Sequence, residues 1–326
     1  MPANIQTIAY YGEVPWHGLG TPVPKGVMAA DMIRAAGLDW GVELRPARGA
    51  KQINSKGEYS RYEVIRMPRE RTEEVEVLLG VVSRRYQPLQ NVEAFEFFDP
   101  LIGEKKAYFE TAGALGQGDR IWVMARMPDA MQIVPGDECL KYLLLSNTHT
   151  GEGSVIAKFT SVRVVCQNTL MMAMEDGQKA YRVRHSKMMQ FRLDELAEFL
   201  AITQKVFLQA EECFRSLAKI KMVGDRLDSY FEAVFPRSEA QKKKGLKPDR
   251  WSFLKDIFEG QPDLQLPRVR GTLWGAYNAV TCFEDYKQPQ QEELQDQRLE
   301  RTWFGGGADI KLRALDKAQE LSATWS

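Results

Sequence analysis

The stretch DRIWVMARM, Asp119–Met127, decides the fold class of this chain because its side chains alternate between two faces. Successive side chains of an extended strand point to opposite sides, so Ile121, Val123 and Ala125 share one face and the residues between them share the other. The pattern therefore predicts a strand. Similar apolar runs follow it and are separated by short polar turns such as THTGEG; these runs are Cys139–Leu145, Ser154–Phe159 and Val162–Cys166.

Upstream of this stretch, two further runs predict a β-hairpin. EYSRYEVIRM, Glu58–Met67, and EVEVLLGVVS, Glu74–Ser83, are alternating or β-branched, and the charged sequence PRERTEE connects them. Between the hairpin and the central stretch, the segment Val92–Leu101 predicts a short helix with Phe95 and Phe98 facing the core. The front half of the chain is thus rich in predicted strands.

Downstream of Cys166 the apolar spacing changes to that of helices. Gln167–Glu175 predicts a helix that begins at a polar cap, and Leu193–Met222 predicts a long amphipathic helix. Four later segments also have helical spacing, namely Asp225–Phe235, Asp249–Phe258, Gly271–Tyr286 and Asp309–Ala323. The stretches Arg237–Lys247 and Gln288–Glu300 are predicted to be exposed connections.

These patterns predict an α+β fold in which an antiparallel sheet precedes a set of helices. We expect a β-rich core domain at residues 1–192, followed by a helical region at residues 193–326 that packs on the core or extends from it. A length of 326 residues allows one large domain or two of ordinary size.

The charge balance and the cysteines narrow the classes of protein to which this chain could belong. Lysine plus arginine number 44 and aspartate plus glutamate number 44, so electrostatic binding must come from local clustering. The four cysteines form no CxxC pair, which favours buried free thiols over disulfides or zinc ligands. The start of the chain has no signal-peptide pattern, and no apolar run approaches the roughly 18 residues of a membrane span. We therefore expect a cytoplasmic protein with no membrane contact.

Two basic segments are candidates for binding a phosphate backbone. Arg84 and Arg85 follow a predicted strand, and Tyr86 beside them could stack on a base. Residues 177–193 contain no acidic side chain but several lysines and arginines, a composition typical of a phosphate-binding strip. Each segment also has a structural interpretation, because the first could form a strand-to-helix corner and the second a solvated linker.

A third candidate is the predicted junction between the strand that ends at Cys166 and the helix after it. Arg163 would lie at this junction, and Asn168 would stand at the helix start, where free backbone N–H groups favour an anion. Together the residues predicted to bind nucleic acid are Arg84, Arg85, Tyr86, Arg163, Asn168, Lys179, Arg182, Arg184 and Lys187, and Trp122 or Tyr181 are further candidates for base stacking.

The sequence gives less support to a catalytic site. The polar turn Asn147–Ser154 carries His149 and Glu152, which could serve acid–base chemistry, bind a metal or simply occupy a hairpin tip. The loop that carries His17 could equally be pinned on the core, and Cys166 has no neighbouring base that would make it a nucleophile. No GxxxxGK[ST], GxGxxG, HExxH or GxSxG motif is present. We therefore predict no cofactor and no metal ion, and a binding protein rather than an enzyme.

Eight stretches spread over nearly the whole chain resemble the DUF932 family, and in particular its phage/plasmid-like subgroup. They are VPWHGLG, GLDW, GVVSRRYQPLQN, ETAGAL, DRIWVMA, YLLLSNTHTGEGS, VRVVCQNTL and GTLWGAYNAV. The resemblance implies a protein of mobile elements, with roles such as replication, recombination, establishment after DNA entry or defence against host systems. One departure is visible, because the family usually has an aspartate where Thr150 follows His149 here. A carboxylate role at this turn would therefore fall to Glu152.

We expect a mobile-element protein that binds nucleic acid, with single-stranded DNA as the favoured ligand and strand annealing as a further activity. Annealing proteins commonly form rings, so a homo-oligomer is expected. A sheet followed by a helix and a basic strip is similar to single-strand annealing proteins only as a fold-level analogy. Two alternatives stay open. One is a protein that blocks a host defence factor, and the other is a nuclease or nucleotide-modifying enzyme built on His17, His149, Glu152 and Asn168.

Overall fold

The computed structural model describes residues 4–12, 18–48, 59–70, 72, 74–163, 169–171, 181–185, 203–245, 248–287 and 298–325. The chain divides into two compact units. Unit 1 comprises Met1–Pro128, Tyr142–Lys158 and Ala180–Ile202, and unit 2 comprises Asp129–Lys141, Phe159–Lys179 and Thr203–Ser326. The two units alternate along the chain, whereas the residue pattern predicts a single boundary after residue 192.

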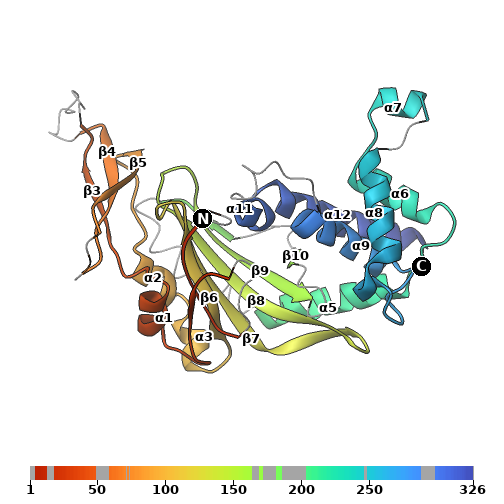
Figure 1. The fold of residues 1–326 in the computed structure, drawn as a ribbon, viewed down its shortest axis with the longest axis horizontal. Coiled ribbons are helices and arrows are strands. Elements are labelled where there is room, and N and C mark those ends of the chain that lie inside the picture. The colour runs from red at the N-terminus through yellow and green to blue at the C-terminus, as the bar shows by residue number, and fades with distance from the viewer. Residues whose placement is uncertain are drawn as a thin grey trace. The chain divides into compact units, whose positions relative to one another are not determined.

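Eight strands form the larger sheet, in the order β10-β9-β8-β7-β6-β1-β2, with β11 paired to β9 (Figure 1). Their bounds are β1 Ile5–Tyr10, β2 Thr21–Pro22, β6 Tyr108–Leu115, β7 Arg120–Val134, β8 Asp137–Thr148, β9 Val155–Arg163, β10 Thr169–Met171 and β11 Tyr181–Val183. Strand β6 pairs antiparallel with both β1 and β7, and β2 pairs parallel with β1. Five consecutive residues of β7, from Ile121 to Ala125, are buried, so both faces of the sheet are covered there.

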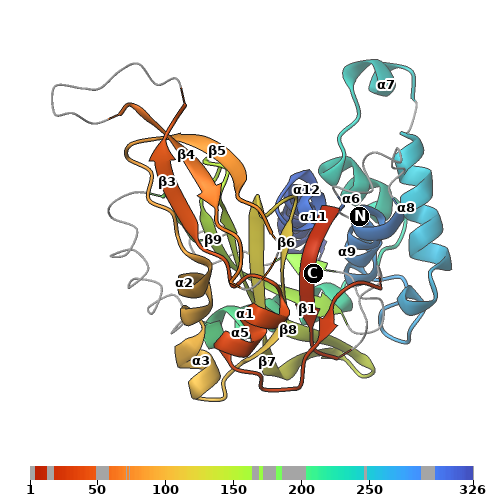
Figure 2. The ribbon, with the colours of Figure 1, turned by 60° about the vertical axis from the view of Figure 1, so that its left-hand side comes forward.

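A second, antiparallel sheet of three strands belongs to unit 1. Its strands are β3 Val42–Pro46, β4 Arg61–Arg66 and β5 Val77–Ser83, and the predicted hairpin is the β4–β5 pair. Figure 2 shows this sheet above the short helices of unit 1. Position 80 in β5 requires glycine because the backbone of Thr150 lies very close to it. A Cβ at this position would lie 2.2 Å from the carbonyl oxygen of Thr150. The polar turn after β8 therefore packs directly on β5.

Three short helices cover part of the larger sheet in unit 1. They are α1 Ala29–Ala35, α2 Asn91–Glu96 and α3 Asp99–Gly103, and α1 contacts both β1 and β6. Phe95 and Phe98 are fully buried, as predicted, and their ring centroids lie 5.7 and 5.8 Å from that of Phe109 in β6. The segment Val92–Leu101, which was expected to form a single helix, thus lies in the two helices α2 and α3. The predicted inward-facing phenylalanines are nevertheless in the core.

Unit 2 is built around α9, Leu273–Cys282, in which all ten residues are buried. A helix that is apolar on all sides is typical of a position in the core, and α9 contacts α5, α8 and α12. The other elements of unit 2 are α5 Thr203–Lys219, α6 Arg226–Val234, α7 Glu239–Lys243, α8 Asp249–Gly260, η2 Pro262–Leu264, the π-helix η3 Phe283–Lys287, α11 Arg298–Trp303 and α12 Gly306–Trp325. No helix in the described part of the chain is long and apolar enough to cross a membrane.

The predicted α+β class is confirmed, but one predicted helix is wrong. Residues 169–171 of the helix expected at Gln167–Glu175 form β10, which pairs antiparallel with β9. The Thr160 hydroxyl also donates a hydrogen bond of 2.8 Å to the carbonyl oxygen of Leu170. A short apolar run has the same composition in a strand and in a buried helix, and here the ladder with β9 decides between them. The helix start that was expected to favour an anion is therefore absent from these residues.

Candidate nucleic-acid interface

Two of the predicted basic segments come together in unit 1. Arg84 and Arg85 form the turn after β5, whereas β11 pairs with the start of β9 and leads into His185. The imidazole of His185 stacks on the ring of Tyr86 with centroids 4.6 Å apart and planes 28° apart. Residues that are distant in the sequence thus become neighbours.

Backbone hydrogen bonds reinforce this contact. The Nδ1 atom of His185 lies 3.0 Å from the carbonyl oxygen of Gln87, and the Gln87 N–H donates to the carbonyl oxygen of His185. A carbonyl can only accept, so the imidazole carries a proton on Nδ1. Burial lowers the pKa of His185, which favours the neutral ring. The two segments are therefore joined by a stack and by a pair of hydrogen bonds.

Four arginines flank this junction, and we call them the arginine surface: Arg84, Arg85, Arg182 and Arg184. All four side chains are exposed. Guanidinium groups bind phosphate oxygens by charge-assisted and often bidentate hydrogen bonds. The arrangement can therefore hold a phosphate backbone without any catalytic group.

Tyr86 does not belong to the accessible part of this surface. The residue is 7% exposed, and its hydroxyl donates a hydrogen bond of 3.3 Å to the carbonyl oxygen of Thr148. Burial raises the pKa of the phenol. Trp122 is also fully buried. Neither ring can stack on a base in this structure, and Tyr86 instead supports the arginines beside it.

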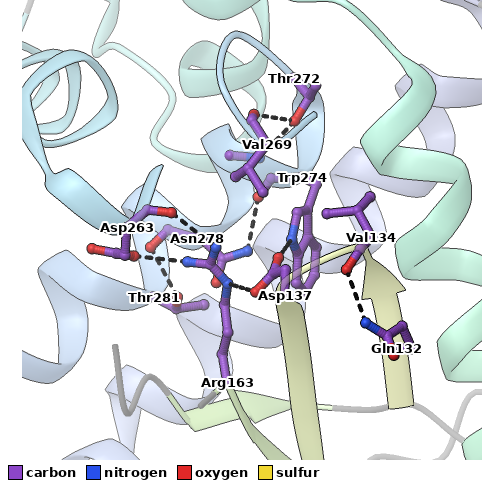
Figure 3. A network of polar contacts seen from close by, with 11 residues as sticks. Gln132, Val134, Asp137, Arg163, Asp263, Val269, Thr272, Trp274, Asn278 and Thr281 are labelled. Atoms are coloured by element: carbon purple, nitrogen blue, oxygen red, sulfur yellow. Dashed lines mark hydrogen bonds and ion pairs between the residues drawn. The ribbon is translucent and has the colours of Figure 1, made fainter. Parts of the chain in front are cut away.

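Arg163 is the clearest correction to the predicted site. It is fully buried in unit 2, where its Nε atom lies 2.6 Å from Asp137 Oδ1 and its Nη1 atom 2.7 Å from Asp263 Oδ2 (Figure 3). The indole N–H of Trp274 donates to the other oxygen of Asp137 at 2.7 Å. Two carboxylates already neutralise this guanidinium, so Arg163 is a structural residue rather than a phosphate contact.

The remaining predicted contacts lie outside the described residues. These are Asn168, Lys179 and Lys187, and the same holds for His17, Cys166 and the side chain of Tyr181. Of the nine residues predicted to bind nucleic acid, four are exposed arginines on the two segments that meet at Tyr86 and His185, and Tyr86 and Arg163 have structural roles.

The polar turn around His149 is a buried network rather than an open catalytic site. The Nε2 atom of His149 lies 3.0 Å from Asn91 Oδ1, and Asn91 donates from its amide nitrogen to the carbonyl oxygens of Leu38 and Trp40. Asn91 Oδ1 must then accept, so His149 carries its proton on Nε2. Burial, with a smaller effect from the charge of His185, lowers the pKa of His149 to about 3. Because the nearby Glu152 is exposed, this geometry favours the interpretation as a hairpin turn.

A second polar cluster in unit 1 was not identified from the sequence, and we call it the Glu110 cluster. It consists of Glu110, Arg126 and Tyr142, with Tyr108 beside them. The Tyr142 hydroxyl donates to Glu110 Oε1 at 2.6 Å, and Arg126 Nη1 lies 3.4 Å from Glu110 Oε2. Burial raises the pKa of the Glu110 carboxyl, although both hydrogen bonds act in the opposite direction.

A sequence signal for this cluster did exist. Glu110 is the one charged residue in the strand YFETAGAL, and its stretch ETAGAL is one of those that resemble the family. Its partners lie on β7 and β8, so only the sheet register could bring them together.

The described residues offer no site for a metal ion or a disulfide. Among them, no group of three or more histidine, cysteine, aspartate or glutamate side chains is placed to hold a metal. The three cysteines in the described ranges, Cys139, Cys213 and Cys282, are free thiols. Burial raises the pKa of Cys282 to about 11, which keeps this thiol protonated.

The structure thus defines an α+β protein with an exposed arginine surface and a separate carboxylate cluster on its larger sheet. The family model described as "Domain of unknown function (DUF932)" matches residues 78–303, and the chain belongs to this family. The match covers the arginines of the β5 turn, the Glu110 cluster and most of unit 2. Neither a curated protein nor a solved structure matches the chain.

Proposed function

We propose that this protein binds nucleic acid through the arginine surface, with single-stranded DNA as its favoured ligand. The observation that supports the proposal best is the junction of Tyr86 and His185, which holds two pairs of exposed arginines together. Solubility alone requires charged residues on the surface. It does not require that two basic segments far apart in the sequence be held next to each other.

The chemistry of the arginine surface suits a polyanion. Each phosphate that a protein neutralises releases counterions, so the logarithm of the binding constant falls with the logarithm of salt by about 0.7 per contact on single strands. Four arginine contacts would give a slope of roughly −3 on the same scale. Annealing of complementary strands needs charge neutralisation and no catalytic residue, so strand annealing is part of the proposal.

The wider setting is also a proposal. We place the protein in the cytoplasm as a homo-oligomer encoded by a mobile element of the phage or plasmid type. Light scattering tests the oligomeric part, because a monomer at micromolar concentration would argue against a ring-forming annealing protein.

The test of DNA binding is fluorescence anisotropy with a labelled oligo-dT across a salt series. The wild-type protein should bind at about 50 mM salt and lose affinity steeply as salt rises. The variants Arg84→Ala/Arg85→Ala and Arg182→Ala/Arg184→Ala should each weaken binding and flatten the slope. Arg34→Ala is the matched control, because Arg34 is an exposed arginine of α1 that pairs with Asp31. Absence of binding at low salt, or a flat salt dependence, would overturn the proposal.

One observation favours a second candidate function, contact with a host protein. Val75, Leu78 and Val81 are large apolar residues in or next to β5 and are all exposed. Exposed apolar patches commonly mark protein interaction sites. Co-purification of a host protein that survives nuclease treatment and is lost in Leu78→Asp/Val81→Asp would support this alternative over DNA binding.

A further inference from the structure

A β-bulge places Glu110 in an unusual position on the larger sheet. The register between β6 and β7 shifts between Phe109 and Thr111, so Glu110 is the extra residue of the bulge. Bulges bend the strand and redirect a side chain, and they are frequent next to functional sites. Here the redirected side chain is a carboxylate that receives hydrogen bonds from Tyr142 and Arg126.

We propose that the Glu110 cluster is a base-recognition site for guanine. This inference rests on the proposed function, because the guanine would belong to the strand that the arginine surface holds. The cluster contains the acceptor and the donor that such a site needs, an aromatic ring and a cation lie at its edge, and all of them lie in unit 1.

The hydrogen-bonding capacity of the cluster selects the base. A carboxylate oxygen can accept two hydrogen bonds. Tyr142 occupies one position on Oε1 and Arg126 one on Oε2. Within the described part of the chain, this leaves one acceptor position on each oxygen, which matches a ligand with two adjacent N–H donors. Guanine presents N1–H and N2–H side by side, whereas adenine, cytosine and thymine present no such pair.

Arg126 supplies the complementary donor. Guanine has the acceptor O6 next to N1–H, so a guanidinium beside the carboxylate can pair with it while the carboxylate takes the two N–H groups. The side chain of Arg126 is 27% exposed and that of Glu110 is 19% exposed, so neither side chain is closed off from solvent. Partial burial also limits competition from water and strengthens each hydrogen bond.

An aromatic ring and a lysine lie at the edge of the cluster. Tyr11 is half-buried and meets Tyr108 edge-on, with ring centroids 5.6 Å apart. The ammonium of Lys25, an exposed residue, lies 4.9 Å from the centroid of Tyr108. Tyr11 offers a surface on which a base can stack, and Lys25 offers a charge for the phosphate of the same nucleotide.

The first experiment compares free mononucleotides by titration calorimetry with the full-length wild-type protein. GMP should bind about tenfold or more tightly than IMP, because IMP lacks only the N2 amino group and so loses one hydrogen bond to a charged acceptor. AMP should bind no better than IMP. Equal affinities for GMP and AMP, or no heat with GMP at millimolar concentration, would overturn the proposal.

Two variants then test whether the preference for GMP over IMP comes from Glu110. Glu110→Gln keeps the shape of the side chain but removes one acceptor oxygen, so the GMP–IMP difference should disappear. Glu96→Gln, an exposed glutamate of α2, should leave it unchanged. If Glu110→Gln retains the GMP preference, the site is elsewhere and the proposal fails. The wild-type comparison does not depend on a variant, so a folding defect in Glu110→Gln would not remove the test.

The outcome for oligo-dT separates this inference from the proposed function. Salt-dependent binding of oligo-dT without a GMP preference would reject the guanine site and leave DNA binding intact. A GMP preference without oligo-dT binding would reject DNA binding and leave a guanine-nucleotide site.

Discussion

The ring of Tyr86 stacks on the ring of His185, and this contact fixes the turn after β5 to the segment that follows β11. The two rings are almost fully buried, whereas the arginines next to them in the sequence are exposed. The stack therefore has a structural role with a consequence for binding, because it joins the two segments that carry the four arginines proposed as the DNA contact.

Loss of the stack should weaken DNA binding without removing a single charge. In His185→Ala the ring contact and the hydrogen bond to Gln87 are both lost, so the two arginine pairs are no longer held together. We expect a clear loss of oligo-dT affinity by anisotropy at about 100 mM salt. Tyr86→Phe should behave close to wild type, because it keeps the stack and loses one hydrogen bond worth about 1 kcal/mol. Wild-type affinity in His185→Ala would contradict this role.

Removal of Arg163 should destabilise unit 2 strongly. Arg163→Met leaves two carboxylates, Asp137 and Asp263, without their buried counter-charge, and breaking such a pair typically costs about 3–5 kcal/mol. Lys242→Met makes the same kind of change in an exposed pair of unit 2, that with Glu239, and should cost less than about 1 kcal/mol. Urea unfolding of both variants checks the contrast, and a similar small loss in the two would be inconsistent with the network.

A compensating change should recover part of that loss. In Arg163→Met/Asp137→Asn one of the two unpaired charges is removed, while that of Asp263 remains, and an amide oxygen remains to accept from the Trp274 indole. The double variant should therefore be more stable than Arg163→Met alone by urea unfolding. If the double variant is less stable than the single one by the full cost of a second independent change, the two residues do not interact as described.

The stability of the protein should decrease as the pH falls, and His149 should contribute to this decrease. Its pKa is about 3 in the folded protein, below the value of about 6.5 of an unfolded chain, so the unfolded state takes up a proton first. Between about pH 6.5 and pH 3 this group lowers stability by up to about 1.4 kcal/mol per pH unit, and above that range it has no effect. His149→Gln should show a shallower decline between pH 7 and pH 5 in urea unfolding. An unchanged slope would show that His149 is not buried as a neutral ring.

The contact at Gly80 should tolerate no side chain. Gly80→Ala places a Cβ 2.2 Å from the carbonyl oxygen of Thr150, so either β5 or the polar turn must move. Such overpacking typically costs about 1–3 kcal/mol. Gly103→Ala in α3 is the control, since a Cβ at that position would have no atom within 4 Å and the φ of Gly103 is not positive. Equal thermal stability of the two variants would contradict the close approach.

The parts of the fold that follow from local periodicity could be predicted from the sequence. The alternation around Ile121 correctly predicted β7, and the two upstream runs predicted the hairpin of β4 and β5. The helical spacing predicted α6, α8 and α12 to within a few residues. Phe95 and Phe98 were also assigned to the core correctly. In each case the information lies within one segment, where the side-chain period and the end of an element are local properties.

The parts that depend on distant partners could not be predicted. Arg163 looked accessible because nothing nearby in the sequence shows that Asp137 and Asp263 would reach it. Strand β10 was mistaken for a helix because its hydrogen bonds come from β9. The Glu110 cluster depends on a bulge, and a shift in sheet register leaves no mark in a single sequence.

The alternation of the two units along the chain has a consequence for how this protein can be dissected. The backbone passes from one unit to the other at residues 128–129, 141–142, 158–159, 179–180 and 202–203. No single cut of the gene yields either unit complete as a continuous polypeptide. A truncation that removes the whole of one unit therefore also removes segments of the other. Genetic dissection of this protein must proceed by point substitution.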